Sequence, residues 1–124
     1  MAVHFLVVIG ILVLSGTIIS VDAATIKQTM DGAMDVTLEY PDSVIAGRDF
    51  AVSIFVQNNG WEDKQNILFK LESQNSSILG KNQTFSIERL SKGGSFGGTL
   101  EFSTTLESDL GTYYLNGLYS HVLL

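Results

Sequence analysis

The amino-acid sequence predicts an all-β fold, an antiparallel β-sandwich. The strongest observation is a run in which every second residue is large and apolar, namely Phe50, Val52, Ile54 and Val56. Because side chains alternate between the two faces of a strand, this run describes a strand with one face on a core. Similar runs recur about every 10 to 15 residues with turn residues between them, which is typical of sandwiches. After residue 23 no stretch keeps a helical period over three turns.

The first 21 residues carry no charge, and residues 5–14 are apolar apart from Gly10. Val21 and Ala23 stand at positions −3 and −1 of a small-residue cleavage site, as in a secretory signal peptide. The alternative is a retained membrane anchor, because twenty uncharged helical residues reach roughly 30 Å and no basic residue precedes the run. Both alternatives predict an N-terminal hydrophobic helix over residues 1–23, outside the sandwich, and an exported remainder.

Residues 24–33 are polar without a clear period, and we interpret them as a linker or a loosely held first edge of the sandwich. The sandwich domain is expected to cover residues 34–124. Pro41 ends its first strand because proline has no N–H to donate. The strands are expected at residues 34–40, 49–57, 65–73, 84–90, 100–106 and 112–123, with turns or loops at 41–47, 74–81 and 91–98.

The inward side of each expected strand carries its large apolar residues. Asn58, Asn59 and Gly60 follow the second strand and supply the left-handed backbone tolerance of a tight turn. The residues expected to face inward in the other strands are Met34, Val36, Leu38, Tyr40, Ile67, Phe69, Leu71, Phe85, Ile87, Leu100, Phe102, Thr104, Leu106, Tyr113, Leu115 and Tyr119.

Composition limits the function more than it identifies it. The chain has 124 residues, which suits one domain and excludes two. With 13 acidic and 7 basic residues and a net charge of −6, it lacks the basic stripe of a nucleic-acid-binding protein. The chain has no cysteine, so disulfides, thiolate metal sites and thiol nucleophiles are excluded. Its two histidines, His4 and His121, are too few for the usual zinc or copper site, and we expect no catalysis and no cofactor.

Two short patterns carry a family resemblance. The first, V-x-x-G-x-x-F-x-V-x-I-x-V-x-N-x-G over residues 44–60, resembles the early strands of CARDB-like and related Ig-like adhesion modules of archaeal and bacterial surface proteins. The second is Gly111, Tyr113 and Leu115, which is similar to the penultimate strand of these modules. The resemblance covers about residues 34 to 120. It implies an Ig-like antiparallel sandwich of about six to seven strands in a non-catalytic extracellular module.

One departure from that family concerns the final strand. These modules turn after the Tyr113 strand and add an edge strand, whereas residues 121–124 show neither a turn nor a polar tail. Three explanations stay open. The sequence is a fragment or a short variant, residues 24–32 fill the edge, or a partner donates a strand by β-augmentation.

The candidate binding residues lie in the connection after the second strand: Asn58, Asn59, Gly60 and Trp61. Loops at the end of a sandwich project from a rigid scaffold and commonly carry binding contacts. Trp61 is either an exposed aromatic for a partner or sugar, or a residue folded over the end of the sandwich.

Other residue groups have a plainer explanation. Asp42, Asp49, Glu62 and Asp63 have carboxylates that suit calcium, but without D-x-D-x-D-G spacing we expect solvated loop charges and no metal site. The glycine-dense residues 92–99 precede a strand and lack the phosphate-loop spacing, so a flexible hairpin connection is expected. N-x-[ST] acceptor sequences for N-glycosylation begin at Asn75 and Asn82.

Together these observations predict a secreted or surface-held Ig-like module that binds a protein or a glycan at the cell surface, or builds structure there. It is expected to contact the membrane only through residues 1–23, if these are kept. Two other functions stay open, an accessory subunit of an envelope enzyme complex anchored by its leader, and a carbohydrate-binding module. The sequence does not specify the ligand or the oligomeric state.

Overall fold

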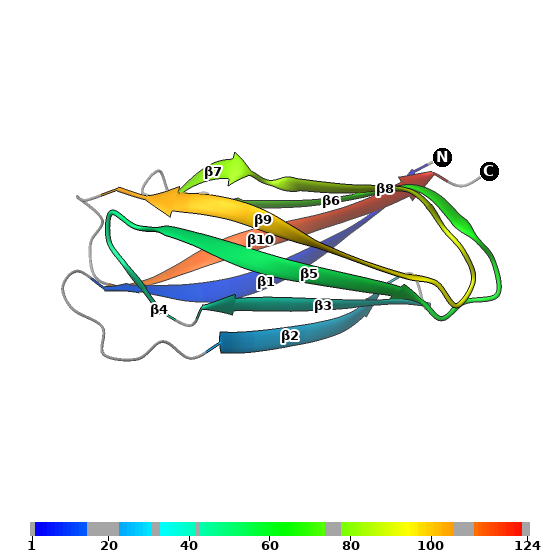
Figure 1. The fold of residues 1–124 in the computed structure, drawn as a ribbon, viewed down its shortest axis with the longest axis horizontal. Coiled ribbons are helices and arrows are strands. Elements are labelled where there is room, and N and C mark those ends of the chain that lie inside the picture. Colours follow the sequence, from blue (N-terminus) through cyan, green and yellow to red (C-terminus); the bar gives the residue numbers. More distant parts are fainter. Residues whose placement is uncertain are drawn as a thin grey trace.

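A computed structural model describes residues 2–14, 23–30, 33–41, 43–73, 78–105 and 111–122. These residues form two five-stranded sheets packed face to face, so the predicted β-sandwich is confirmed (Figure 1). Sheet A has the order β4 (Ser43–Ile45), β1 (Ala2–Leu14), β10 (Gly111–Val122), β6 (Lys64–Ser73) and β8 (Thr84–Leu90). Sheet B has the order β2 (Ala23–Met30), β3 (Met34–Pro41), β5 (Asp49–Asn58), β9 (Ser95–Thr104) and β7 (Ile78–Asn82).

The core lies between the inner faces of the two sheets. Along β5 the burial alternates at every residue, with Phe50, Val52, Ile54 and Val56 inside as the sequence predicted. The Phe50 ring stacks on that of its cross-strand partner Phe102, with 5.3 Å between the ring centroids. The predicted inward residues of β3, β6, β8, β9 and β10 whose side chains are described are also buried, Phe85 only partly. Leu106 and the side chains of Tyr113 and Tyr119 lie outside the described residues.

The chain changes sheets at most of its connections, which places turns from both layers at each end of the sandwich. At one end the turn between β4 and β5 is tied to the last residue of β9. The buried Thr104 hydroxyl accepts a hydrogen bond from the N–H of Gly47 at 2.8 Å and donates to the carbonyl of Arg48 at 3.0 Å. Gly47 has a φ of 84°, a backbone conformation that favours glycine.

Four strand segments were predicted as connections. The polar residues 24–33 contain β2, which pairs with β3 at an edge of sheet B, in line with the first-edge interpretation and not with a linker. The short β4 lies in the predicted turn after Pro41, β7 lies in the predicted loop 74–81, and β9 starts at Ser95, inside the glycine-dense stretch. Edge strands and glycine-rich strands bury few side chains, so these segments show no apolar alternation.

The N-terminal segment also differs from the prediction. A helix was expected over residues 1–23, whereas Ala2–Leu14 form strand β1 and Ala23 begins β2. A continuous apolar run does not distinguish a helix from a buried strand by its period, and valine and isoleucine favour strands. Among the described residues, no helix is long and apolar enough to span a membrane. Cleavage after Ala23 stays a prediction.

The β8 edge of sheet A packs on β9 through a row of aromatic rings. The Phe85 ring lies 6.5 Å from that of Phe69 and 5.7 Å from that of Phe96, measured between centroids. Phe85 fits there because Gly98 has no side chain; a Cβ added to Gly98 would lie 2.2 Å from the Phe85 ring. A Cβ added to the neighbouring Gly97 would meet atoms only at 3.7 Å, an ordinary contact.

We therefore predict that Gly98→Ala destabilises the domain by about 1–3 kcal/mol, because the ring has to shift between its two aromatic neighbours. The matched variant Gly97→Ala should change stability by less than about 0.5 kcal/mol. Urea unfolding of both variants and the parent measures the difference. Equal effects of the two substitutions would contradict this packing.

Candidate functional site

The candidate site is the connection between β5 and β6, residues 59–63, at one end of the sandwich (Figure 1). It crosses from sheet B to sheet A and lies beside two other turns, the one before β3 and the one between β8 and β9. Hydrogen bonds join it to both. The N–H of Asn59 donates to the carbonyl of Ala33, and the N–H of Gly93 donates to the carbonyl of Asn58.

Asn58 is the buried polar residue that holds these turns together, with an exposed fraction of 0%. Its side-chain Nδ2 donates to the carbonyl of Glu62 at 2.8 Å and to the carbonyl of Leu90 at 3.1 Å. Its Oδ1 accepts the N–H of Gly60 at 3.0 Å. A buried amide with its donors and acceptor paired stabilises its surroundings, so the connection is fixed at its base.

Asn59 and Gly60 fix the connection against the turn before β3. The Asn59 side chain donates to the carboxylate of Asp35, which also accepts the hydroxyl of Thr29 at 2.7 Å. A Cβ added to Gly60 would lie 2.8 Å from the Cβ of Ala33, so Gly60 permits a close approach of the two turns. The expected left-handed turn at residues 58–60 is wrong. Positive φ angles in the described ranges occur at Gly47, Asn66 and Gly93, and not at residues 58–60. The connection needs no tight hairpin turn, because it crosses from sheet B to sheet A.

Asp63 ties the far side of the connection to sheet A. Its carboxylate accepts a 2.5 Å hydrogen bond from the Arg89 guanidinium and a 2.9 Å bond from the N–H of Lys92. These two bonds, with the nearby positive charges, lower the pKa of the Asp63 carboxyl below its usual value. Both partners belong to the end of β8 and the turn after it, so the connection is held on both sides.

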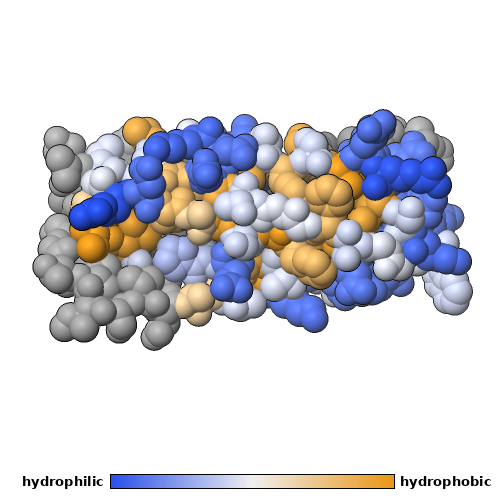
Figure 2. All heavy atoms as spheres, in the orientation of Figure 1, coloured by the Kyte–Doolittle hydropathy of each residue, from blue (hydrophilic) through white to orange (hydrophobic). Residues whose placement is uncertain are grey.

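Trp61 projects from this fixed connection and is 92% exposed. The alternative that it folds over the end of the sandwich is therefore wrong. The other exposed large apolar residues among those described, such as Phe55 at 47%, lie on strands and are about half covered by their neighbours. In Figure 2, polar side chains gather at the end of the molecule where this connection lies, and in the sequence Glu62 and Asp63 follow Trp61 directly.

A polar hollow lies next to the connection, between β6, β8 and the start of β9. It has a volume of about 750 Å³ and is lined by Gln65, Asn66, Ser86, Ile87, Glu88, Arg89 and Phe96. Asn66 has a φ of 52° where the pairing of β6 with β10 shifts register, as at a β-bulge. Because Arg89 lines the hollow and also binds Asp63, the hollow and the Trp61 connection form one continuous surface.

The four predicted residues are therefore close together but play different parts. Asn58 and Gly60 are structural, Asn59 is engaged with Asp35, and only Trp61 offers its side chain to a ligand. The supporting roles of Asp35, Asp63 and Arg89 were not predicted, because each residue belongs to a different part of the chain. Asp63 was expected only as a solvated loop charge, and Asp35 and Arg89 fall inside expected strands, where no sequence signal marks a support.

The remaining candidates are scattered. Asn82 is exposed in β7, where the chain is about to cross to sheet A, and Asn75 lies outside the described residues, as does Asp42. Asp49 pairs with Lys81 at 2.6 Å and raises the pKa of that lysine. In the described part of the chain, no three histidine, aspartate or glutamate side chains group as a metal site would require. His4 and His121 have described backbones only, in β1 and β10.

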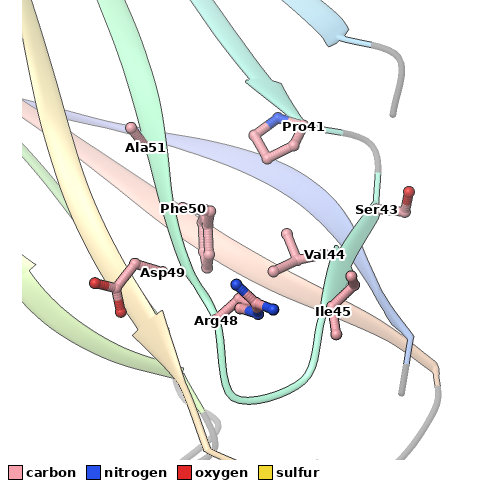
Figure 3. A pocket seen from close by; sticks show the side chains of 8 residues that line it. All are labelled: Pro41, Ser43, Val44, Ile45, Arg48, Asp49, Phe50 and Ala51. Carbon is pink, nitrogen blue, oxygen red and sulfur yellow. The ribbon is translucent and has the colours of Figure 1, made fainter. Parts of the chain in front are cut away.

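A second cavity lies at the opposite end, beside β4, with a volume of about 450 Å³. Figure 3 shows Val44 and Phe50 projecting into the space between β4 and β5, with the Arg48 guanidinium next to them. Its walls are mostly apolar, with Val44, Ile45 and Phe50 among the residues that line it. The cavity lies where β4 and β5, strands of different sheets, separate.

No protein-family model and no curated protein matches this chain. The arrangement of its own residues is therefore the basis for the function proposed below.

We predict that Asn58→Ala lowers the free energy of unfolding by about 2–3 kcal/mol, because it removes three hydrogen bonds from a buried site, two of them to the carbonyls of Glu62 and Leu90. Asn59→Ala, which removes one exposed bond, should cost less than about 1 kcal/mol. Denaturant unfolding measures both. A milder effect at residue 58 than at residue 59 would contradict the assigned roles.

We also predict that acid loosens the connection. A depressed folded-state pKa means that the Asp63 contribution is present above the unfolded pKa of about 4 and is lost as the pH falls through the folded value. Trp61 is the only tryptophan, so its fluorescence anisotropy reports the motion of the connection. The anisotropy should fall below about pH 4 in the parent. It should be low already at pH 7 in Asp63→Asn and unchanged from the parent in Glu62→Gln.

Proposed function

We propose that this protein is a non-catalytic, exported Ig-like module that binds a protein partner at the cell surface, with Trp61 as the central contact. The observation that carries the proposal is an almost fully exposed tryptophan on a connection fixed by Asn58, Asn59 and Asp63. Tryptophan is enriched among the residues that contribute most to binding energy at protein interfaces, and a fixed connection loses little entropy on binding.

A protein partner fits this geometry better than a glycan. Trp61 protrudes, so the partner has to supply the pocket, as protein surfaces do for tryptophan contacts at interface centres. The surrounding polar side chains of Glu62, Asp63 and Arg89 suit the polar rim of such an interface. The adjoining hollow beside Phe96 extends the contact surface along β8.

Export is supported by the composition of the first 23 residues, which are apolar and uncharged up to Asp22 and carry the small residues of a cleavage site. The absence of cysteine and the acidic balance agree with either side of a membrane. Mass spectrometry of the native N-terminus tests this part of the proposal. A chain starting at Ala24 supports secretion, and one that retains Met1 favours an anchored accessory subunit.

The binding test compares three immobilised proteins: the parent, Trp61→Ala and Phe55→Ala. Phe55 is a matched control because it is an exposed aromatic on the outer face of β5, away from the connection. We expect the parent and Phe55→Ala to retain the same proteins from a cell-surface fraction and Trp61→Ala to lose at least about tenfold of that retention. Circular dichroism checks that all three are folded.

Glycan arrays with the same three proteins distinguish the carbohydrate-binding alternative. Retention on glycans that depends on Trp61 would replace the protein partner by a glycan. Equal retention of surface proteins by the parent and Trp61→Ala would end the proposal for this connection. With the purified partner, the Trp61 emission should shift to shorter wavelength as the ring leaves water.

A further inference from the structure

Strand β1 occupies a place between two other strands of sheet A. It pairs antiparallel with β10 over twelve residue pairs, from Ala2 with Val122 to Val13 with Gly111. On its other side, residues 12–14 pair in parallel with Ser43–Ile45. β1 is thus the strand that joins β4 to the rest of sheet A.

The residues that fill this place are the same ones that carry the export signals. The predicted cleavage site ends at Ala23, and β2 begins at that residue. Cleavage there removes β1 and Ala23, the first residue of β2, and leaves β2 from Ala24 and every later strand in the chain. Sheet B keeps all five of its strands, whereas sheet A loses the one next to β10.

Loss of β1 would expose the edge of β10 that is now inside sheet A. The backbone N–H and C=O groups of β10 that face β1 would have no partner, and β4 would have no neighbour in its sheet. Beneath this edge lies Leu115, which is 0% exposed in the complete sandwich. Unpaired backbone beside an uncovered apolar core is the condition under which proteins accept a strand from another chain.

The cavity beside β4 lies at one end of this edge. Its apolar residues Val44, Ile45 and Phe50 stand where β4 and β5 separate, and Figure 3 shows the β1 ribbon running behind it. Two of these residues, Val44 and Ile45, belong to the strand that β1 holds in place. Removing β1 would therefore release β4, which forms one wall of this cavity.

We propose that the processed protein accepts a strand from a partner polypeptide in the place that β1 occupies here. The inference rests on the export and cleavage in the proposed function, but not on Trp61. The register defines the strand. Ile9 pairs with the buried Leu115, and the residues at alternate positions of the sequence from Val3 to Val13 are all large and apolar. The partner segment is extended, about twelve residues long, apolar at alternate positions and antiparallel to β10.

We call the place that β1 occupies the slot. Its position between two strands favours a free segment of the partner over a second folded copy of this chain. The strand lies between β10 and β4, so it needs neighbours on both sides at its end next to β4. An edge strand of a second sandwich brings its own sheet with it and can pair on one side only. A tail or linker of the partner has both edges free.

The experiment uses the full chain with a protease site introduced between residues 14 and 23. After cleavage, the two pieces should stay together in size-exclusion chromatography under native conditions and separate in denaturant. A fluorescent peptide with the sequence of residues 2–14 and a lysine tail for solubility should then exchange into the nicked protein.

Two altered peptides test whether backbone pairing carries the binding. Adjacent N–H groups of a strand point to opposite sides, so the double change Val7→Pro and Val8→Pro removes a donor toward β10 whichever residue supplies it. This peptide should bind at least about tenfold more weakly than the parent peptide. The matched peptide with Val7→Ile and Val8→Ile should bind as well as the parent.

Three outcomes would overturn the proposal. The large piece separates from the N-terminal piece and is a folded monomer, or the proline and isoleucine peptides bind equally well, or the large piece forms a dimer that excludes the peptide. A native chain that begins at Met1 would also overturn it, because the slot then stays filled. None of these outcomes affects the comparison between Trp61→Ala and Phe55→Ala, so the two proposals fail separately.

Discussion

This structure depends on one constraint: the apolar inner face of each sheet has to be covered by the inner face of the other. Sheet B meets it most fully at its centre, where β5 places an apolar residue inward at every second position from Phe50 to Val56. The neighbouring β9 adds the buried Leu100 and Phe102, and Phe50 stacks on Phe102. Burial of this kind requires each strand to keep its register, because a shift by one residue would turn the apolar side chains toward water. The pairing of β5 with β3 and β9 is regular over the strand, which makes these three strands the firm part of the domain.

At the ends of the sandwich, turns bring backbone polar groups to the edge of the core, where these groups need hydrogen-bond partners. Two buried polar side chains provide such partners. Thr104 binds the turn between β4 and β5, and Asn58 binds the connection to β6 and the end of β8. Each side chain joins segments that are far apart in sequence, so each fixes a turn to the opposite layer. The hydrogen bonds of Asn58 thus hold the backbone on both sides of Trp61, at Gly60 and Glu62.

The sequence was most informative where burial alternates and least informative where it does not. Strands β3, β5, β6 and β8 were predicted with their inward residues because one face of each is apolar. β7 was missed because only its first residue is buried, and the start of β9 because its glycines resemble a loop. The position of the candidate site was predicted from turn residues alone. Its internal roles were not, since the burial of Asn58 depends on Leu90, 32 residues away.

The N-terminal segment shows why an apolar sequence does not by itself select a structure. Residues 5–14 have large apolar side chains on every face of a helix and on both faces of a strand, so they are compatible with a lipid environment and with a sandwich interior. Pairing decides between them: in a membrane the backbone can satisfy its hydrogen bonds only within a helix, whereas beside β10 it satisfies them across the sheet. If export and cleavage remove the segment, the backbone N–H and C=O groups of β10 that paired with it still need hydrogen-bond partners. The position beside β10 that β1 occupies is thus defined by β10 and β4, which belong to the rest of the domain.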